Sequence, residues 1–307
     1  MRIAIVGAGA IGCLFGSRLH RAGHSVLLIH HDRRIAASIK NKGVRLRELS
    51  GRVVRAYIET KSGLTRHDSP ELVMVTVKAY DTEEVASLIE KSVAPKVPVL
   101  SLQNGLGSVE NLQNHLGSDS IIAGTTTEGA VTTGPGEVVH TGSGMTWVGE
   151  TNGMVSERCH IIEMAFRRAG FSTIITKGIQ GVLWTKAIVN SAINPISALT
   201  RVRNGDLQKT PELREVALEI IGEGSAVARA NGILLKPSPK SLLQKILAST
   251  PTNKSSMLQD IEAGRKTEIR QLNGMISRLG GAVGVSTPLN DILAKLVLGL
   301  EVSQSQF

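Results

Sequence analysis

Near the N-terminus the chain reads Ile3-Ala4-Ile5-Val6-Gly7-Ala8-Gly9-Ala10-Ile11-Gly12. The apolar start of this run predicts a buried β-strand, and the glycine spacing is typical of the strand-to-helix turn that binds the pyrophosphate of a dinucleotide. Gly7 permits a tight turn, Gly9 has no side chain to keep phosphate away from the backbone, and Gly12 allows close packing of the helix. A second apolar strand at 25–29 completes a βαβ unit. We therefore expect the residues from Gly7 to Gly12 to bind the cofactor.

The segment after the second strand, His30-His31-Asp32-Arg33-Arg34, bears on which dinucleotide binds. Proteins that bind NAD usually place an acid at this strand tip for the ribose 2′-hydroxyl, whereas proteins that bind NADP offer positive charge to the 2′-phosphate. Here the tip is His30 and two arginines follow, so we expect NADP(H). Asp32 is contrary evidence, because its carboxylate could bind the ribose of NAD, and the whole segment could also be a solvated loop.

Composition limits the class of protein. The 307 residues are enough for two domains, and 41% hydrophobic with 20% charged content is typical of a globular protein. The net charge of +9 is compatible with nucleic-acid binding, but the basic residues are dispersed and only 3% of the chain is aromatic. A dinucleotide and a carboxylate substrate would favour the same positive charge. We therefore expect a small-molecule substrate, no nucleic-acid partner and, since no apolar stretch is long enough, no membrane span.

The two cysteines, Cys13 and Cys159, have no metal-ligand spacing and fall in expected helices. We expect both to be reduced, buried thiols in a cytoplasmic protein that has no metal site.

Strands and helices alternate through the first half of the chain. We expect buried strands at 71–78, 98–102 and 121–124, with helices at 82–91 and 109–116 between them. This βαβα alternation predicts a doubly wound, mostly parallel sheet of the Rossmann-like kind.

Other segments complete the predicted architecture. Short strands are expected within 44–59, a hairpin or meander within 129–149, a helix at 156–169 and a strand at 171–176. Beyond Lys177 only helical periodicity is present, with breaks expected at Pro195, Asn204-Gly205, 237–239 and Thr250-Pro251. We therefore expect an α/β N-terminal Rossmann-like domain over 1–176 and an all-α C-terminal domain over 177–307.

Two residues at the ends of expected strands are candidates for ligand contact. Lys78 ends the third long strand and Asn104 follows the fourth, and ligands of open α/β sheets lie beyond the carboxyl ends of the strands. Lys78 could contact cofactor phosphate or ribose, and Asn104 could bind the nicotinamide ribose or the substrate. The alternatives are a surface lysine and an ordinary turn residue before Gly105.

A helix expected from Ile179 to about Leu199 is apolar on nearly every side. Lys186, Asn190 and Asn194 recur every fourth residue and form one polar line along it. Because a buried ammonium without a partner costs several kcal/mol, this line either faces a cleft or is held by structural partners. A partly desolvated lysine with a lowered pKa could act as the general acid in reduction of a ketone.

A second helix is expected from Met257 onward. Its buried stripe has spacings of three and four and consists of Met257, Ile261, Gly264, Glu268, Leu272, Met275 and Leu279. Glu268 stands where the pattern calls for an apolar residue, so its carboxylate should meet a polar substrate or a buried cation, for which Lys186 is the nearest candidate. A purely structural ion pair is the alternative. Ser256 lies near the same face, or else caps the helix through a capping box with Gln259.

These motifs together resemble the 2-dehydropantoate 2-reductase, or ketopantoate reductase, family. The segments that carry the resemblance are Gly7-Ala8-Gly9-Ala10-Ile11-Gly12, Val75-Thr76-Val77-Lys78-Ala79, Gln103-Asn104-Gly105, Gly124-Thr125-Thr126, Trp184-Thr185-Lys186-Ala187, Asn190, Asn194-Pro195, Ser255-Ser256-Met257-Leu258-Gln259-Asp260 and Thr267-Glu268-Ile269. The resemblance implies NADPH-dependent reduction of 2-dehydropantoate to (R)-pantoate, on the route to pantothenate and coenzyme A.

The resemblance also implies a role for each candidate residue. Lys186 would protonate the carbonyl oxygen and Glu268 would position both the lysine and the substrate. The residues expected to bind the substrate hydroxyl and carboxylate are Asn190, Asn194 and Ser256. Asn104 and Glu268 would lie between substrate and cofactor, and Lys78 beside the cofactor. Family members commonly have an arginine where this chain has His31, so His31 and Arg33, with Arg34, would have to bind the 2′-phosphate.

Other functions stay open at this point. The same scaffold could reduce another 2-keto acid, serve as an opine dehydrogenase, or sense NADP(H) without turnover. Glu128 has no role that the sequence predicts, and the oligomeric state is open, with a homodimer among the alternatives.

Overall fold

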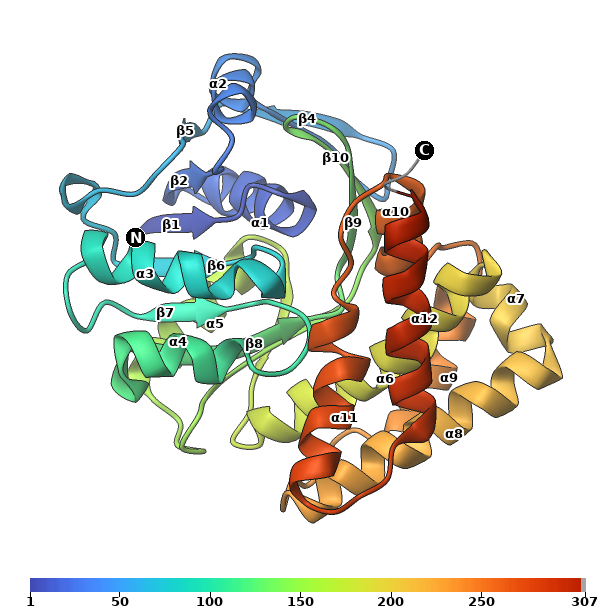
Figure 1. Ribbon diagram of the computed structural model, residues 1–307. Coiled ribbons are helices and arrows are strands. Elements are labelled where there is room, and N and C mark those ends of the chain that lie inside the picture. Colours follow the sequence, from blue (N-terminus) through green and yellow to red (C-terminus); the bar gives the residue numbers. More distant parts are fainter. Residues whose placement is uncertain (305–307) are drawn as a thin grey trace. The chain divides into compact units, whose positions relative to one another are not determined.

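The computed structural model describes residues 1–304, which divide into two compact units. The first unit comprises Met1–Gln103 and Ser108–Ile179, and the second comprises Asn104–Gly107 together with the chain from Gln180 onward. The predicted combination of an α/β N-terminal part and a helical C-terminal part is confirmed (Figure 1).

The first unit is built on an eight-stranded sheet with the order β12-β11-β8-β7-β6-β1-β2-β5. In this order the strands are Ser172–Ile175, Met145–Glu150, Ile121–Thr126, Val99–Ser101, Leu72–Val75, Arg2–Val6, Ser25–Ile29 and Glu59–Lys61. All neighbours pair in parallel except β11, which runs antiparallel to β8. Every residue of β6 and β8 is buried, as expected for central strands covered on both faces.

Five α-helices accompany this sheet within the described part of the first unit. They are α1 (Ala10–Arg21), α2 (Arg33–Lys42), α3 (Thr82–Ser92), α4 (Ser108–Leu116) and α5 (Glu157–Arg168). Helices α3 and α4 contact each other and lie in front of the sheet in Figure 1, whereas α1 contacts α5. This arrangement is that of a doubly wound fold.

A second sheet of four strands packs on α1. Its order is β4-β3-β10-β9, formed by Val53–Ala56, Val44–Arg47, Glu137–Gly142 and Gly129–Gly134. Because α1 contacts all four strands as well as β1 and β2, its residues Cys13, Leu14 and Phe15 are buried. The hairpin predicted within 129–149 is therefore present as β9 and β10, while β11 joins the main sheet.

The second unit contains helices and no β-strand among its described residues. Its helices are α6 (Ile179–Thr200), α7 (Asn204–Lys209), α8 (Pro211–Ala230), α9 (Pro239–Ser249), α10 (Ser256–Glu262), α11 (Asn273–Ala282) and α12 (Pro288–Gln304), with the short 3₁₀-helix η4 (Ile269–Gln271) before α11. Helix α6 supplies several fully buried residues of this core, among them Ile188, Val189 and Ala192.

Three local predictions are wrong. Pro195 does not break a helix, because α6 continues through it to Thr200. Asn204-Gly205 begins α7 instead of interrupting a helix, since the break falls at the three residues before it. The strand predicted over 71–78 ends at Val75, because Lys78 caps the 3₁₀-helix η2 (Ala79–Asp81) and its carbonyl accepts from Asp81 N. The breaks at 237–239 and Thr250-Pro251 are confirmed.

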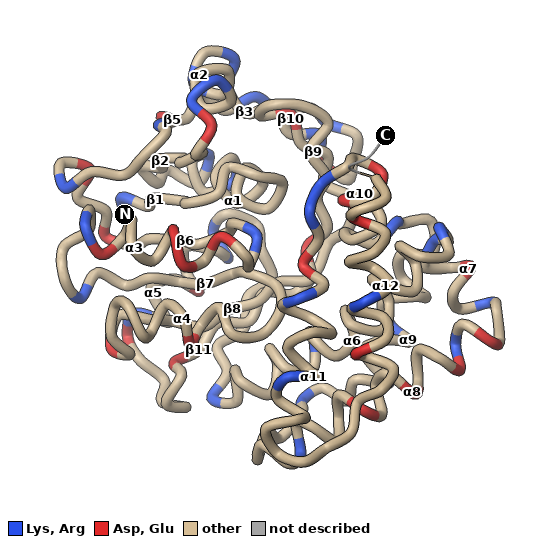
Figure 2. Tube along the Cα trace, viewed as in Figure 1, with Lys and Arg blue, Asp and Glu red and all other residues tan. Residues whose placement is uncertain are grey.

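Both cysteines are buried free thiols, in α1 and α5. Among residues 1–304 no cluster of His, Cys, Asp and Glu could hold a metal ion, and no helix has the length and hydropathy of a membrane span. Figure 2 shows Lys and Arg spread along both units, and they are not concentrated on one helix or strand.

Candidate active site

Lys186 lies on α6 in the second unit, with its side chain partly buried. Its Nζ donates a hydrogen bond to Asn104 Oδ1 at 2.8 Å. Burial lowers the pKa of Lys186 to about 8, and the negative charge of Glu268 opposes this shift. An ammonium group with such a pKa is mostly protonated at neutral pH and is a stronger acid than an ordinary lysine.

Asn104 reaches Lys186 because the four residues after Gln103 leave the first unit and pack with the second. Gly105 has a φ of +81°, and a Cβ there would lie 2.7 Å from Gln271 O. Leu106 N donates to the same carbonyl at 3.0 Å. A glycine is therefore required for the close approach that places Asn104 in the second unit.

Glu268 is 5% exposed and lies at the start of η4. Asn104 Nδ2 is 3.5 Å from Glu268 Oε2, so the Asn104 amide has its oxygen at the ammonium and its nitrogen toward the carboxylate. One cation and one anion thus lie near each other, as expected from the sequence, and the Asn104 amide contacts both.

The helix predicted over Met257 to Leu279 is wrong. Helix α10 ends at Glu262 because Gly264 adopts a φ of +63° and Arg265 N donates to Asp260 O at 2.8 Å, a common way to end a helix. The chain then turns, and Glu301 Oε1 accepts from Thr267 N at 2.8 Å. Glu268 is therefore buried by a turn and not by helical periodicity.

Asn190 and Asn194 follow Lys186 along α6, as predicted. Asn194 is 6% exposed and its Nδ2 lies 3.5 Å from Ser256 Oγ, while Asn190 is partly buried. Of the two alternatives left open for Ser256, the capping box is absent, because Ser255 caps α10 by accepting from Leu258 N at 3.1 Å. Ser256 is the first helical residue, and its hydroxyl is directed to Asn194.

The glycine-rich turn joins β1 to α1 in the first unit. Gly7 has a φ of +113°, and a Cβ on Gly12 would clash with Gly7 O. A Cβ on Gly9 would instead meet no atom within 4 Å, so the turn is open on that side. The first amides of α1, those of Ala10, Ile11 and Gly12, have no acceptor within the helix and are available to an anion.

At the tip of β2 the carboxylate of Asp32 caps α2. Its Oδ1 accepts from Arg34 N at 2.7 Å and from Ile35 N at 3.2 Å, and these bonds lower the Asp32 pKa. The rings of His30 and His31 stack with centroids 4.8 Å apart. His31 and Arg33 are exposed, and Lys78 is partly buried after β6.

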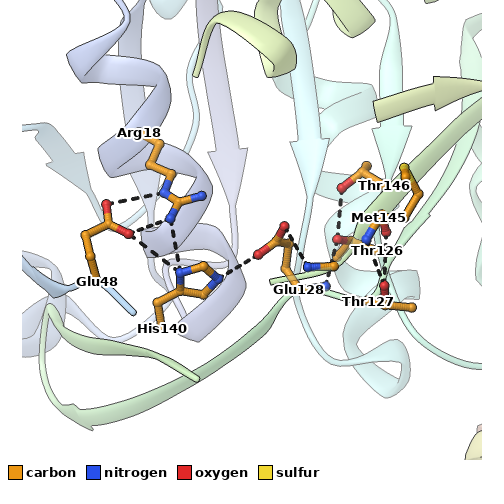
Figure 3. Close-up of polar contacts among 9 residues, drawn as sticks. Arg18, Glu48, Thr126, Thr127, Glu128, His140, Met145 and Thr146 are labelled. Atoms are coloured by element: carbon orange, nitrogen blue, oxygen red, sulfur yellow. Dashed lines mark hydrogen bonds and ion pairs between the residues drawn. The ribbon is translucent and has the colours of Figure 1, made fainter. Parts of the chain in front are cut away.

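Glu128 belongs to a buried cluster in the first unit (Figure 3). Its Oε2 lies 2.6 Å from His140 Nε2, and both side chains are 1% exposed. Arg18, which can only donate, contacts His140 Nδ1 at 3.1 Å and is paired with Glu48. His140 therefore accepts at Nδ1 and donates from Nε2 to Glu128. The four residues come from distant segments, so no local sequence pattern could reveal the cluster.

Comparisons with known proteins match both parts of the chain. The family model described as "Ketopantoate reductase PanE/ApbA" matches residues 3–153, and its C-terminal counterpart matches residues 178–301. The 2-dehydropantoate 2-reductase of Archaeoglobus fulgidus is 36% identical over 98% of both chains.

Two solved structures are similar to this chain over nearly its whole length. A PanE/ApbA family ketopantoate reductase from Ralstonia eutropha has a TM-score of 0.91 and 32% identity, over 99% of this chain and 100% of that one. D-Mandelate dehydrogenase in its ternary structure with NADH and anilino(oxo)acetate has a TM-score of 0.94 and 29% identity, over 99% of each chain.

Proposed function

The chain belongs to the ketopantoate reductase PanE/ApbA family, and we propose that it reduces 2-dehydropantoate to (R)-pantoate with NADPH. The observation that carries the proposal is Lys186, a lysine with a pKa of about 8 whose Nζ is fixed at 2.8 Å from Asn104 Oδ1. Such a lysine supplies the acid that reduction of a ketone needs.

When bound, NADPH supplies a hydride to the C2 carbonyl of the keto acid. Lys186 transfers one proton to the carbonyl oxygen as that oxygen gains electrons, so the product is a neutral hydroxyl group and the lysine is left as a free amine. Solvent then restores the proton. Since the pKa of Lys186 is about 8, the group is charged before the reaction and gives up its proton more readily than an exposed lysine.

Glu268 and Asn104 position the acid. The charge of Glu268 raises the pKa of Lys186 against the effect of burial and so keeps the lysine protonated at neutral pH. Asn104 Oδ1 accepts one of the three ammonium hydrogens, which orients the others. In this proposal both residues also contact the substrate and the cofactor.

Asn190, Asn194 and Ser256 bind the hydroxyl and carboxylate of the substrate. Their amide and hydroxyl groups can donate and accept without adding charge beside Lys186. The distance of 3.5 Å between Asn194 Nδ2 and Ser256 Oγ supports a common binding site for the two side chains.

The first unit, expected over 1–176, would hold the dinucleotide, and the helical domain over 177–307 the keto acid. The turn from Gly7 through Ala8, Gly9, Ala10 and Ile11 to Gly12 fits a pyrophosphate, because Gly9 faces open space and the first amides of α1 are available.

We propose NADPH over NADH. Asp32 already accepts two backbone hydrogen bonds as the cap of α2, whereas His31 and Arg33 are exposed and can reach a 2′-phosphate. Lys78 is proposed to lie beside the cofactor.

The test is the loss of NADPH absorbance on addition of 2-dehydropantoate, with NADH as the control cofactor. The similarity to D-mandelate dehydrogenase favours a second candidate, reduction of a bulkier aryl 2-keto acid, so an aryl 2-keto acid belongs in the same panel. An appreciably higher kcat/KM for that compound would show that an aryl 2-keto acid, and not 2-dehydropantoate, is the preferred substrate. Dinucleotide binding without turnover of any keto acid would favour a sensor.

Two further expectations accompany the proposal. The free thiols Cys13 and Cys159 favour a reducing compartment such as the cytoplasm. A homodimer stays an expected assembly, which light scattering can test.

A further inference from the structure

Pro195 lies inside α6, directly after Asn194 of the polar line. A proline has no N–H, so the carbonyl four residues earlier, Ser191 O, loses its helical hydrogen bond. This carbonyl falls between Asn190 and Asn194. A buried carbonyl without a donor would cost roughly 1–3 kcal/mol, and the helix would distort to find one.

The missing donor comes from another helix. Asn273, the first residue of α11, donates from Nδ2 to Ser191 O at 2.9 Å. Its second Nδ2 hydrogen goes to Asn290 Oδ1 at 3.0 Å. Asn273 and Asn290 are both 0% exposed.

The direction of these amides is set by a carboxylate. Glu223 Oε2 accepts from Asn290 Nδ2 at 2.7 Å and from Asn290 N at 3.0 Å, and Oε1 accepts from Leu289 N at 2.9 Å. Because a carboxylate only accepts, Asn290 must present its oxygen to Asn273, and Asn273 must present its nitrogen to Ser191. The chain of bonds thus delivers a donor to the carbonyl that Pro195 leaves open.

We propose that Asn273 is a positioning residue for the substrate-binding side chains of α6, through the hydrogen bond that replaces the one Pro195 removes. The inference rests on the proposed function of Asn190 and Asn194. Lys186 and Asn190 precede the open carbonyl and Asn194 follows it, so the bond from Asn273 sets how the two halves of the polar line are oriented. Lys186 stays held by Asn104 when this bond is lost, so the displacement falls on Asn194 and weakens binding of the keto acid more than proton transfer.

The experiment compares the wild type with Asn273→Ala, Pro195→Ala and the double variant. Loss of the Asn273 donor should raise the KM for the keto acid about tenfold, with kcat within about threefold and the dissociation constant of NADPH unchanged. In the double variant the alanine at 195 restores an N–H that can reach Ser191 O, so the KM should return to the value of Pro195→Ala.

Asn290→Ala is the matched control. It removes an equally buried amide from the same network, but Ser191 O only accepts and so still selects the Nδ2 side of Asn273 when Asn290 is gone. We expect its urea midpoint to fall while its KM stays within about threefold of the wild type. If Asn290→Ala and Asn273→Ala raise the KM equally, the role is general packing and the proposal is wrong.

The remaining outcomes are also decisive. An unchanged KM in folded Asn273→Ala, or a raised KM that persists in the double variant, overturns the proposal. Should Asn273→Ala fail to fold, recovery of folding and KM in the double variant supports it and failure to recover overturns it. A wild type that reduces no 2-keto acid would defeat the proposed function instead. The urea midpoints of the same four proteins would then decide whether Asn273 and Pro195 are coupled.

Discussion

Lys186 Nζ and Asn104 Oδ1 lie 2.8 Å apart although 82 positions separate the two residues. The contact exists because the segment Asn104–Gly107 packs with the helical unit while the strand before it belongs to the sheet. The same amide lies 3.5 Å from Glu268 Oε2. Lys186, Asn104 and Glu268 therefore form one continuous group. A substitution at any of the three should alter the position or the pKa of the acid, Lys186.

Lys186→Ala should lower kcat by about 100-fold or more, the usual scale for loss of a general acid. The variant should still fold but be less stable, because the buried carboxylate of Glu268 loses the nearby cation. Steady-state rates with 2-dehydropantoate and NADPH test this, with the NADPH dissociation constant as the control for folding. Normal turnover would remove the lysine from the mechanism.

The pH dependence of kcat should report the acid. With a pKa of about 8, Lys186 is protonated below that pH and loses its proton above it, so kcat should fall as the pH rises through about 8. Glu268→Gln removes a charge that raises this pKa, so the fall should begin at lower pH and the KM for the keto acid should rise. Profiles of both proteins from about pH 6 to 10 measure the shift. Identical pH profiles for the two proteins would show that Glu268 does not affect the pKa of Lys186.

Local patterns predicted much of the fold and the helix that carries Lys186, Asn190 and Asn194. The βαβ unit and the polar line on α6 are visible in the sequence because glycine spacing and a helical repeat are properties of short segments. The second sheet was not predicted as such, because β3 and β10 pair across about ninety residues of chain.

The two main errors in the helical part have different causes. The stripe from Met257 appeared continuous because Gly264 fits a helical interval, yet its positive φ ends α10. Pro195 looked like a break because a proline usually is one, yet Asn273 supplies the donor that lets α6 continue. A residue distant in sequence therefore decided the structure at Pro195, whereas a local turn at Gly264 ended α10.

Arg33→Ala should reduce the preference for NADPH over NADH about tenfold, because an exposed guanidinium is expected to pair with the 2′-phosphate. The KM for NADPH should rise while that for NADH stays constant, since NADH has no such phosphate. Both values come from the same absorbance assay. A parallel rise for the two cofactors would place Arg33 away from the 2′ position.

Glu128→Ala should destabilise the first unit by about 3 kcal/mol. The substitution leaves His140 Nε2–H and Gly144 N, which lie 2.6 and 3.1 Å from the carboxylate, without an acceptor in the buried cluster of Figure 3. Urea unfolding measures the loss, and Lys295→Ala, which breaks an exposed ion pair with Asp291, is the control that should change little. Because Glu128 contacts neither Lys186 nor its partners in the described contacts, kcat of the folded variant should stay close to that of the wild type. A large loss of kcat without loss of stability would instead give Glu128 a direct part in the reaction.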